Sequence, residues 1–165
     1  MKSILLTLVM SFLTISHTQA FDQLDRNVAE YNLSDRGVGL INYKNGKAYD
    51  PVSYFVEEGS SALVGSDEFS LVYEEVEYLF SSAVNMKSFL TDTARYEPTF
   101  GGWCARAMVA GQKVQINTEL FTVVGRRVFF FVNNRAKRFF DRNLEKNILL
   151  ADKNWKEISG EAPRI

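Results

Sequence analysis

The chain has 165 residues, 46% of them hydrophobic, with 19 basic against 20 acidic residues and a formal net charge of -1. This balance gives no whole-molecule positive field, so nucleic acid is not expected as a partner. The length suits one domain with its own core and is too short for two domains of ordinary size.

Residues 1–20 have the pattern of a secretory signal peptide. Lys2 precedes an apolar run over residues 4–13, and small or polar residues lead to Ala20. The apolar run is shorter than the roughly 20 residues that a membrane helix needs, and no later stretch is long enough. We therefore expect cleavage after Ala20 and a soluble periplasmic or secreted product without a transmembrane segment.

The use of histidine and cysteine restricts the possible chemistry. His17 is the only histidine and lies in the predicted leader, so the mature chain has no imidazole for a Ser-His-Asp or Cys-His arrangement. Cys104 is the only cysteine, which excludes an internal disulfide. With one thiol and no acids clustered at a ligand spacing, we predict no metal site and no cofactor in the monomer.

The polar residues 21–47 form an N-terminal arm, within which the stretch 37–43 is compatible with an edge strand. Asp50 suits an N-cap and Pro51 a first helical position, which favours a short helix over residues 50–56. Apolar and polar residues alternate on both sides of a tight turn over residues 69–80, which predicts a hairpin with an aromatic face inward.

A serine at position 81 or 82 caps a predicted helix over residues 82–91. The good helix formers that follow Gly102 predict another helix over 103–110, ended by Gly111. A second hairpin is expected over 121–132, and its last strand is apolar on both faces, which is typical of a strand covered on both sides.

Apolar residues at spacings of four and three predict a C-terminal amphipathic helix over about 143–158. The tail 159–165 contains Gly160 and Pro163 and is expected to be loose. We thus predict one α+β domain over residues 48–158, with a small antiparallel sheet of two hairpins, short helices and the C-terminal helix.

Several pieces of sequence keep a fixed order and spacing over residues 48–156. They are Tyr49 to Phe55, Gly65-Ser66 with Phe69, Tyr78 to Ser82 with Asn85 and Phe89, Tyr96 to Ala105, Gly111, and Ala151 to Trp155. In these pieces the chain resembles the YHS-domain proteins, in particular their exported bacterial branch. The resemblance implies a compact α+β domain in a family without a settled biochemical role.

The resemblance also bears on metal and redox chemistry. Shorter YHS modules attached to metal transporters carry cysteines in the neighbourhoods where this chain has Ser53 and Asn85, so their metal binding is not expected here. Some members of the exported branch are labelled as selenoproteins, which implies redox chemistry at the position of Cys104.

The segment that contains Gly101, Gly102, Trp103 and Cys104 is the first candidate site. A thiol at a helix start lies near unpaired backbone N–H groups, which favour the reactive thiolate, and the glycines allow close approach of a substrate or backbone. The alternative is that Cys104 is a small buried hydrophobe, as free cysteines often are.

Two other groups of residues suggest binding. Tyr49, Asp50 and Ser53 form a candidate polar pocket for a small molecule, although a capping role for Asp50 explains part of this pattern without function. A basic concentration suits an anion or an acidic headgroup, although a solvated face balanced by Asp141, Glu145 and Asp152 explains it better. It comprises Arg126, Arg127, Arg135, Lys137, Arg138 and Arg142.

The leading functional hypothesis is a non-catalytic binding or accessory module of the cell envelope, with a small molecule or an envelope protein as partner. No catalytic constellation exists beyond the lone cysteine. The alternative is a thiol-dependent redox protein that uses Cys104, which would need a resolving thiol from a partner because the chain has no second cysteine.

Overall fold

The structure is a computed structural model that describes residues 26–56 and 61–164, so the predicted signal peptide lies outside the described residues. The described chain consists of short 3-10 helices, α-helices and two pairs of strands. In chain order the elements are η2 (Val28–Glu30), η3 (Ser53–Phe55), β1 (Ser66–Tyr73), β2 (Val76–Phe80), α1 (Ala83–Thr91), α2 (Thr93–Tyr96), η4 (Thr99–Gly102), α3 (Ala105–Met108), β3 (Asn117–Val124), β4 (Arg127–Phe131), α4 (Asn134–Arg142) and α5 (Leu144–Ser159).

Both predicted hairpins are confirmed, and the fold is α+β. Strand β1 pairs antiparallel with β2, and β3 pairs antiparallel with β4. In each pair two residues separate the strands, so the turns lie where the alternation of apolar and polar residues is interrupted.

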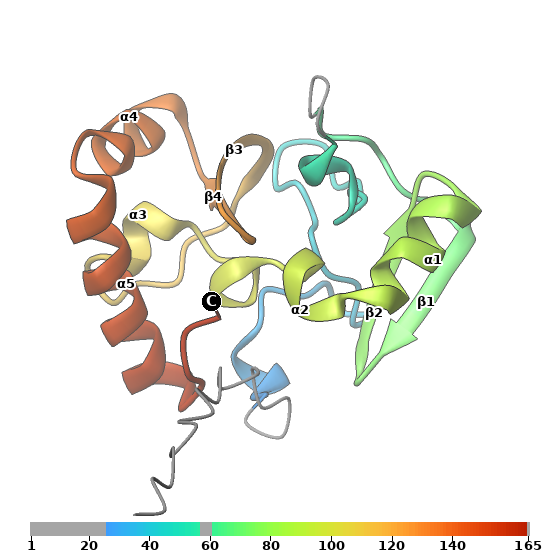
Figure 1. Ribbon diagram of the computed structural model, residues 1–165, viewed down its shortest axis with the longest axis horizontal. Helices are drawn as coiled ribbons and strands as arrows, with labels where there is room; N and C mark the ends of the chain where they lie inside the picture. Colours follow the sequence, from blue (N-terminus) through green and yellow to red (C-terminus); the bar gives the residue numbers. More distant parts are fainter. Residues whose placement is uncertain (1–25, 57–60, 165) are drawn as a thin grey trace, which may run out of the picture.

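The two hairpins form separate two-stranded sheets and do not join. In each hairpin the second strand is instead bridged by another segment of the chain. Val38 forms a parallel bridge with Glu77 of β2, and Cys104 forms one with Phe130 of β4. The hairpin β1–β2 therefore lies at one end of the molecule, while β3–β4 lies in the middle (Figure 1).

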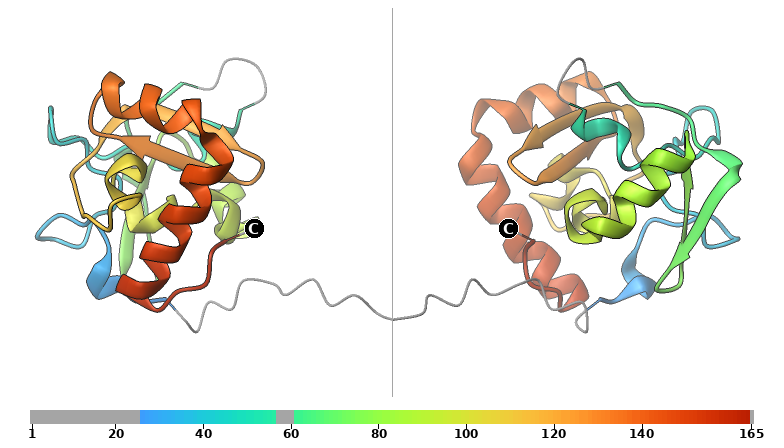
Figure 2. Two further views of the ribbon diagram at one scale, coloured as in Figure 1. Left: turned by 90° about the vertical axis from the view of Figure 1, so that its left-hand side faces the viewer. Right: turned by 45° about the vertical axis from the view of Figure 1, so that its right-hand side comes forward.

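The core is built around β4, against which β3, η4, α3 and α4 pack. Phe129, Phe130 and Phe131 are completely buried, so β4 is covered on both faces as its composition predicts. Helices α3 and α5 lie along one side of the β3–β4 hairpin, and α1 covers the β1–β2 hairpin at the far end (Figures 1 and 2).

Two of the predicted helices are confirmed within a residue or two. Helix α1 begins after Ser82, whose Oγ accepts a hydrogen bond from the backbone N–H of Asn85 at 3.2 Å, the expected capping contact. Helix α5 ends at Gly160, which adopts φ 82° and so provides the left-handed C-terminal cap that other residues adopt less readily.

Other predicted elements differ from the structure. In place of the predicted helix 50–56 the chain has a turn followed by η3, and in place of 103–110 it has the single turn α3. The stretch 37–43 forms isolated bridges and no strand. Helix α4 was not predicted, because only Ala136, Phe139 and Phe140 of its nine residues are apolar, although their spacing of three and four is helical.

The prediction of a loose tail at 159–165 is wrong over its described part. Glu161 and Arg164 are only 2% and 8% exposed. Glu161 accepts hydrogen bonds from the backbone N–H of Asn27 at 2.8 Å and from Nε1 of Trp155 at 3.0 Å. The turn at Gly160 directs the chain back onto the domain, so its charged side chains find partners in the core.

Candidate functional site

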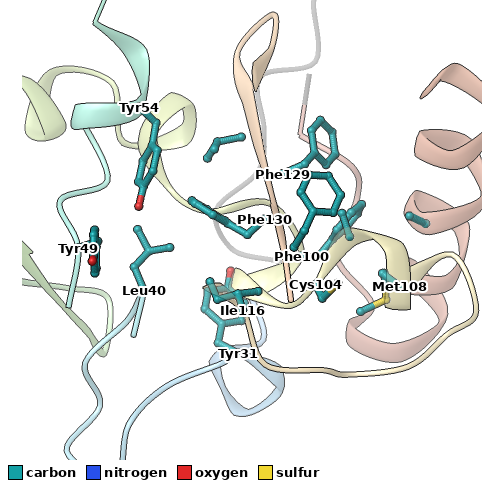
Figure 3. Packing of buried hydrophobic residues seen from close by; sticks show 14 of the residues in the cluster. Tyr31, Leu40, Tyr49, Tyr54, Phe100, Cys104, Met108, Ile116, Phe129 and Phe130 are labelled. Carbon is teal, nitrogen blue, oxygen red and sulfur yellow. The ribbon is translucent and has the colours of Figure 1, made fainter. Parts of the chain in front are cut away.

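Cys104 lies inside the core, and its exposed fraction is 0%. Its backbone N–H donates to the carbonyl of Val114 at 3.0 Å, and its bridge to Phe130 aligns this segment with β4. Figure 3 shows the residue among the side chains of Phe100, Met108 and Phe129. Helix α3, which begins directly after Cys104, has only four residues, so the helix dipole expected to activate the thiol is small.

Trp103 fastens the N-terminal segment to the domain. Its Nε1 donates to the backbone carbonyl of Glu30 at 2.7 Å. The ammonium group of Lys113 lies 5.7 Å from the centre of the Trp103 ring and forms an ion pair with Glu30 at 2.6 Å. These contacts give the indole a structural role that the sequence did not suggest.

Gly101 and Gly102 permit a close approach, but the approaching groups belong to the protein. Both adopt left-handed backbone conformations, with φ of 57° and 84°. A Cβ at Gly101 would lie 2.7 Å from Cδ1 of Tyr31 and 3.1 Å from Cη2 of Trp155. The glycine pair therefore lets the N-terminal segment and α5 meet over this turn.

The carboxylate of Asp50 is completely buried and accepts four hydrogen bonds. Oδ1 accepts from the backbone N–H of Val52 at 2.8 Å, which supports the predicted capping role locally. Oδ2 accepts from the backbone N–H of Ser81 at 2.9 Å, from the Ser81 hydroxyl at 2.7 Å and from Nδ2 of Asn85 at 2.7 Å. Asp50 therefore joins two segments, and because its carboxylate is completely buried it is not open to a ligand.

Ser53 and Tyr49 have internal partners as well. The Ser53 hydroxyl donates to the carbonyl of Asp50 at 2.8 Å and accepts from the backbone N–H of Leu63 at 3.2 Å. The Tyr49 hydroxyl donates to Oε1 of Glu119 at 3.1 Å and accepts from Nδ2 of Asn45.

The predicted site residues do not converge on one place. Figure 3 shows Tyr49 on one side of the core and Cys104 on the other, with Leu40, Ile116 and Phe130 between them. The candidates therefore divide into a group around Asp50 and a group around Cys104, and each group consists of structural contacts.

Sequence reasoning missed a buried charged cluster around Glu97. The Glu97 side chain is completely buried and forms ion pairs with Arg26 at 2.5 Å and Arg164 at 3.1 Å. The Tyr78 hydroxyl donates to its Oε1 at 2.9 Å, and Arg164 also donates to the hydroxyl of Tyr31 at 3.1 Å. Because the two arginines lie at opposite ends of the described chain, no local pattern indicates the cluster.

Burial and charge shift the titration of this cluster. Desolvation raises the pKa of Tyr31 and of Tyr78 well above the ordinary tyrosine value. Burial alone would lower the pKa of Arg26 and of Arg164, but the carboxylate of Glu97 and the other polar groups of the cluster together outweigh it, so both pKa values are raised. The arginines therefore stay charged, and the cluster joins the N-terminal and C-terminal segments to the middle of the chain.

Two hollows of about 380 and 470 Å3 lie beside the N-terminal segment and share Ser34, Asp35, Ile41 and Gly46 in their walls. None of the predicted site residues lines either hollow. Within residues 26–56 and 61–164, no three histidine, cysteine, aspartate or glutamate side chains gather as a metal site would require. Over the same part of the chain, no helix combines the length and apolar character needed to cross a bilayer.

Searches with protein-family models, among curated proteins and among solved structures found no match to this chain. The resemblance to the YHS-domain proteins therefore remains an expectation from the sequence alone.

Proposed function

We propose that this chain is an exported, YHS-like domain that acts as a non-catalytic binding or accessory module of the cell envelope. The observation that carries the proposal is the burial of both groups that suggested chemistry, since Cys104 and Asp50 are each 0% exposed. A buried thiol cannot meet a substrate, and a carboxylate with four internal hydrogen bonds does not act as a free acid or base.

The burial of Cys104 counts against the alternative of a thiol-dependent redox protein. Thiol–disulfide exchange requires the sulfur to approach a disulfide directly. Met108 and Phe129 beside it are themselves completely buried, so opening this region would disrupt the core. The chain also lacks a second cysteine that could resolve a mixed disulfide.

A turnover assay separates these two functions. The folded protein is mixed with a small disulfide and excess glutathione, and disulfide reduction is followed against glutathione alone. We expect no increase in rate for the wild type or for Cys104→Ala. A protein-dependent rate that disappears in Cys104→Ala would contradict the proposal and favour the redox alternative.

Export is tested separately by intact mass spectrometry of the protein recovered from the envelope fraction. We expect a chain that begins at Phe21, because residues 1–20 have the signal-peptide pattern. A protein that retains Met1 would contradict this part of the proposal.

A further inference from the structure

Helices α4 and α5 expose apolar side chains on the side that faces away from the core. Phe139, Leu149 and Leu150 are 43%, 70% and 39% exposed. We define the α4–α5 face as these three residues together with three cations, so that its members are Arg138, Phe139, Arg142, Lys146, Leu149 and Leu150. The left view of Figure 2 shows α5 in front with α4 above it.

The core does not explain why these positions are apolar. Leu149 precedes the buried Ala151 by two residues, which places it about 160° around the helix from it at about 100° per residue. In α4, Arg138 precedes the buried Phe140 by two residues, so Arg138 likewise lies about 160° around the helix from the buried side. Asn147 joins the two helices, because its Nδ2 donates to the carbonyls of Phe139 and Phe140 at 3.1 and 2.8 Å.

The cations of this face have no carboxylate partner in the part of the chain that the structure describes. Among the ion pairs of the described residues, Arg138, Arg142 and Lys146 have none, and the guanidinium of Arg142 lies 5.4 Å from the centre of the Phe139 ring. Two acids of the same helices are neutralised by other residues, since Asp141 pairs with Lys137 and Asp152 with Arg127. Glu157 pairs with Lys153, and the exposed Glu145 lies one turn before Leu149 on the same side of α5.

The opposite end of the molecule is acidic. Strands β1 and β2 and the turn between them contain no basic residue and carry Asp67, Glu68, Glu74, Glu75 and Glu77, of which Glu74 is paired with Arg26. Figure 1 places this hairpin at the end of the molecule away from α4 and α5. The protein therefore has a charge dipole in spite of a formal net charge near zero, and a negative surface would attract its α4–α5 end.

We propose that the α4–α5 face binds the surface of an anionic phospholipid bilayer. Phe139, Leu149 and Leu150 enter the headgroup region, while Arg138, Arg142 and Lys146 contact lipid phosphates. Exposed apolar residues bordered by lysine and arginine on a helix are typical of interfacial membrane binding. The inference rests on the proposed function and names the partner of that module.

The test is flotation of the intact recovered protein with vesicles of phosphatidylcholine, either pure or containing phosphatidylglycerol. We expect binding only to the anionic vesicles, lowered at least tenfold when sodium chloride is raised from about 0.05 to 0.5 M. Leu149→Gln and the double variant Arg138→Gln, Arg142→Gln should each lower binding by about tenfold or more.

Matched controls lie on α1 at the acidic end. Val84 is 72% exposed, close to the value for Leu149, and Lys87 is an exposed cation. Val84→Gln and Lys87→Gln should leave vesicle binding unchanged within twofold. Equal losses in the control variants, or equal binding to both kinds of vesicle, would overturn the inference.

The same variants distinguish a protein partner. If anionic vesicles are not bound but sedimentation shows self-association that Leu149→Gln abolishes, the face is an interface between copies of the chain and the lipid proposal is wrong. Absence of lipid binding leaves the non-catalytic proposal standing, because that proposal is tested by thiol-dependent turnover and by the reactivity of Cys104.

Discussion

Arg164 forms an ion pair with the buried carboxylate of Glu97, with Nη2 3.1 Å from Oε2, across 67 residues of sequence. Arg26 approaches the same carboxylate from the N-terminal segment. Three segments that are remote in the sequence therefore meet at one buried charge, and a negative group there without its cations would be strongly unfavourable.

Replacement of Arg164 by methionine tests this cluster. The variant keeps most of the side-chain volume but removes one cation, so we expect a loss of about 3 kcal/mol in the free energy of unfolding. The measurement is urea denaturation followed by circular dichroism. The exposed Arg36→Met is the control, and it should change the free energy by less than about 0.5 kcal/mol. Equal effects in both variants would contradict the structural role of Arg164.

The buried tyrosines predict a loss of stability at alkaline pH. Desolvation raises the pKa of Tyr31, Tyr54 and Tyr78 in the folded protein, so above pH 10 the unfolded chain binds fewer protons than the folded one. The stability they contribute is fully present below pH 10 and falls above it by up to about 1.4 kcal/mol per pH unit for each tyrosine.

Urea denaturation between pH 8 and 11 measures this dependence. Tyr78→Phe removes one titrating group and should flatten the decline above pH 10, whatever its effect at pH 8. Tyr43→Phe is the control, because Tyr43 is 46% exposed. A decline that is as steep in Tyr78→Phe as in the wild type would contradict the assignment.

The turn at Gly101 predicts a graded response to alanine. Gly46 and Gly101 both adopt positive φ, but a Cβ at Gly46 meets nothing within 4 Å, whereas one at Gly101 lies 2.7 Å from Tyr31. Gly46→Ala should cost only the left-handed strain of about 1 kcal/mol, and Gly101→Ala about 2–3 kcal/mol more because of overpacking. Thermal and urea denaturation measure the difference. Equal costs at the two positions would show that the contact with Tyr31 does not limit the site.

Local patterns in the sequence predict the local elements. The alternation of apolar and polar residues locates both hairpins, Ser82 locates the start of α1, and Gly160 locates the end of α5. These features depend on neighbours within a few residues, so propensity and capping rules describe them adequately.

Features that depend on distant partners were not predicted. The order of the C-terminal segment depends on Glu97, and the position of Gly101 depends on Tyr31, 70 residues earlier. The state of Cys104 depends on its alignment with Phe130 in a strand that follows it in the chain. A pattern of one cysteine behind two glycines therefore fits a reactive thiol and a buried one equally, and only tertiary packing distinguishes them.

The reactivity of Cys104 tests the central claim most directly. The folded protein is treated with iodoacetamide at neutral and mildly alkaline pH, and the labelling rate is compared with that of the same protein in denaturant. Because the thiol is completely buried, we predict folded-state labelling at least about a hundredfold slower than in denaturant, limited by opening of the core. Labelling of the folded protein as fast as the denatured chain would contradict the account and return Cys104 to the list of candidate catalytic groups.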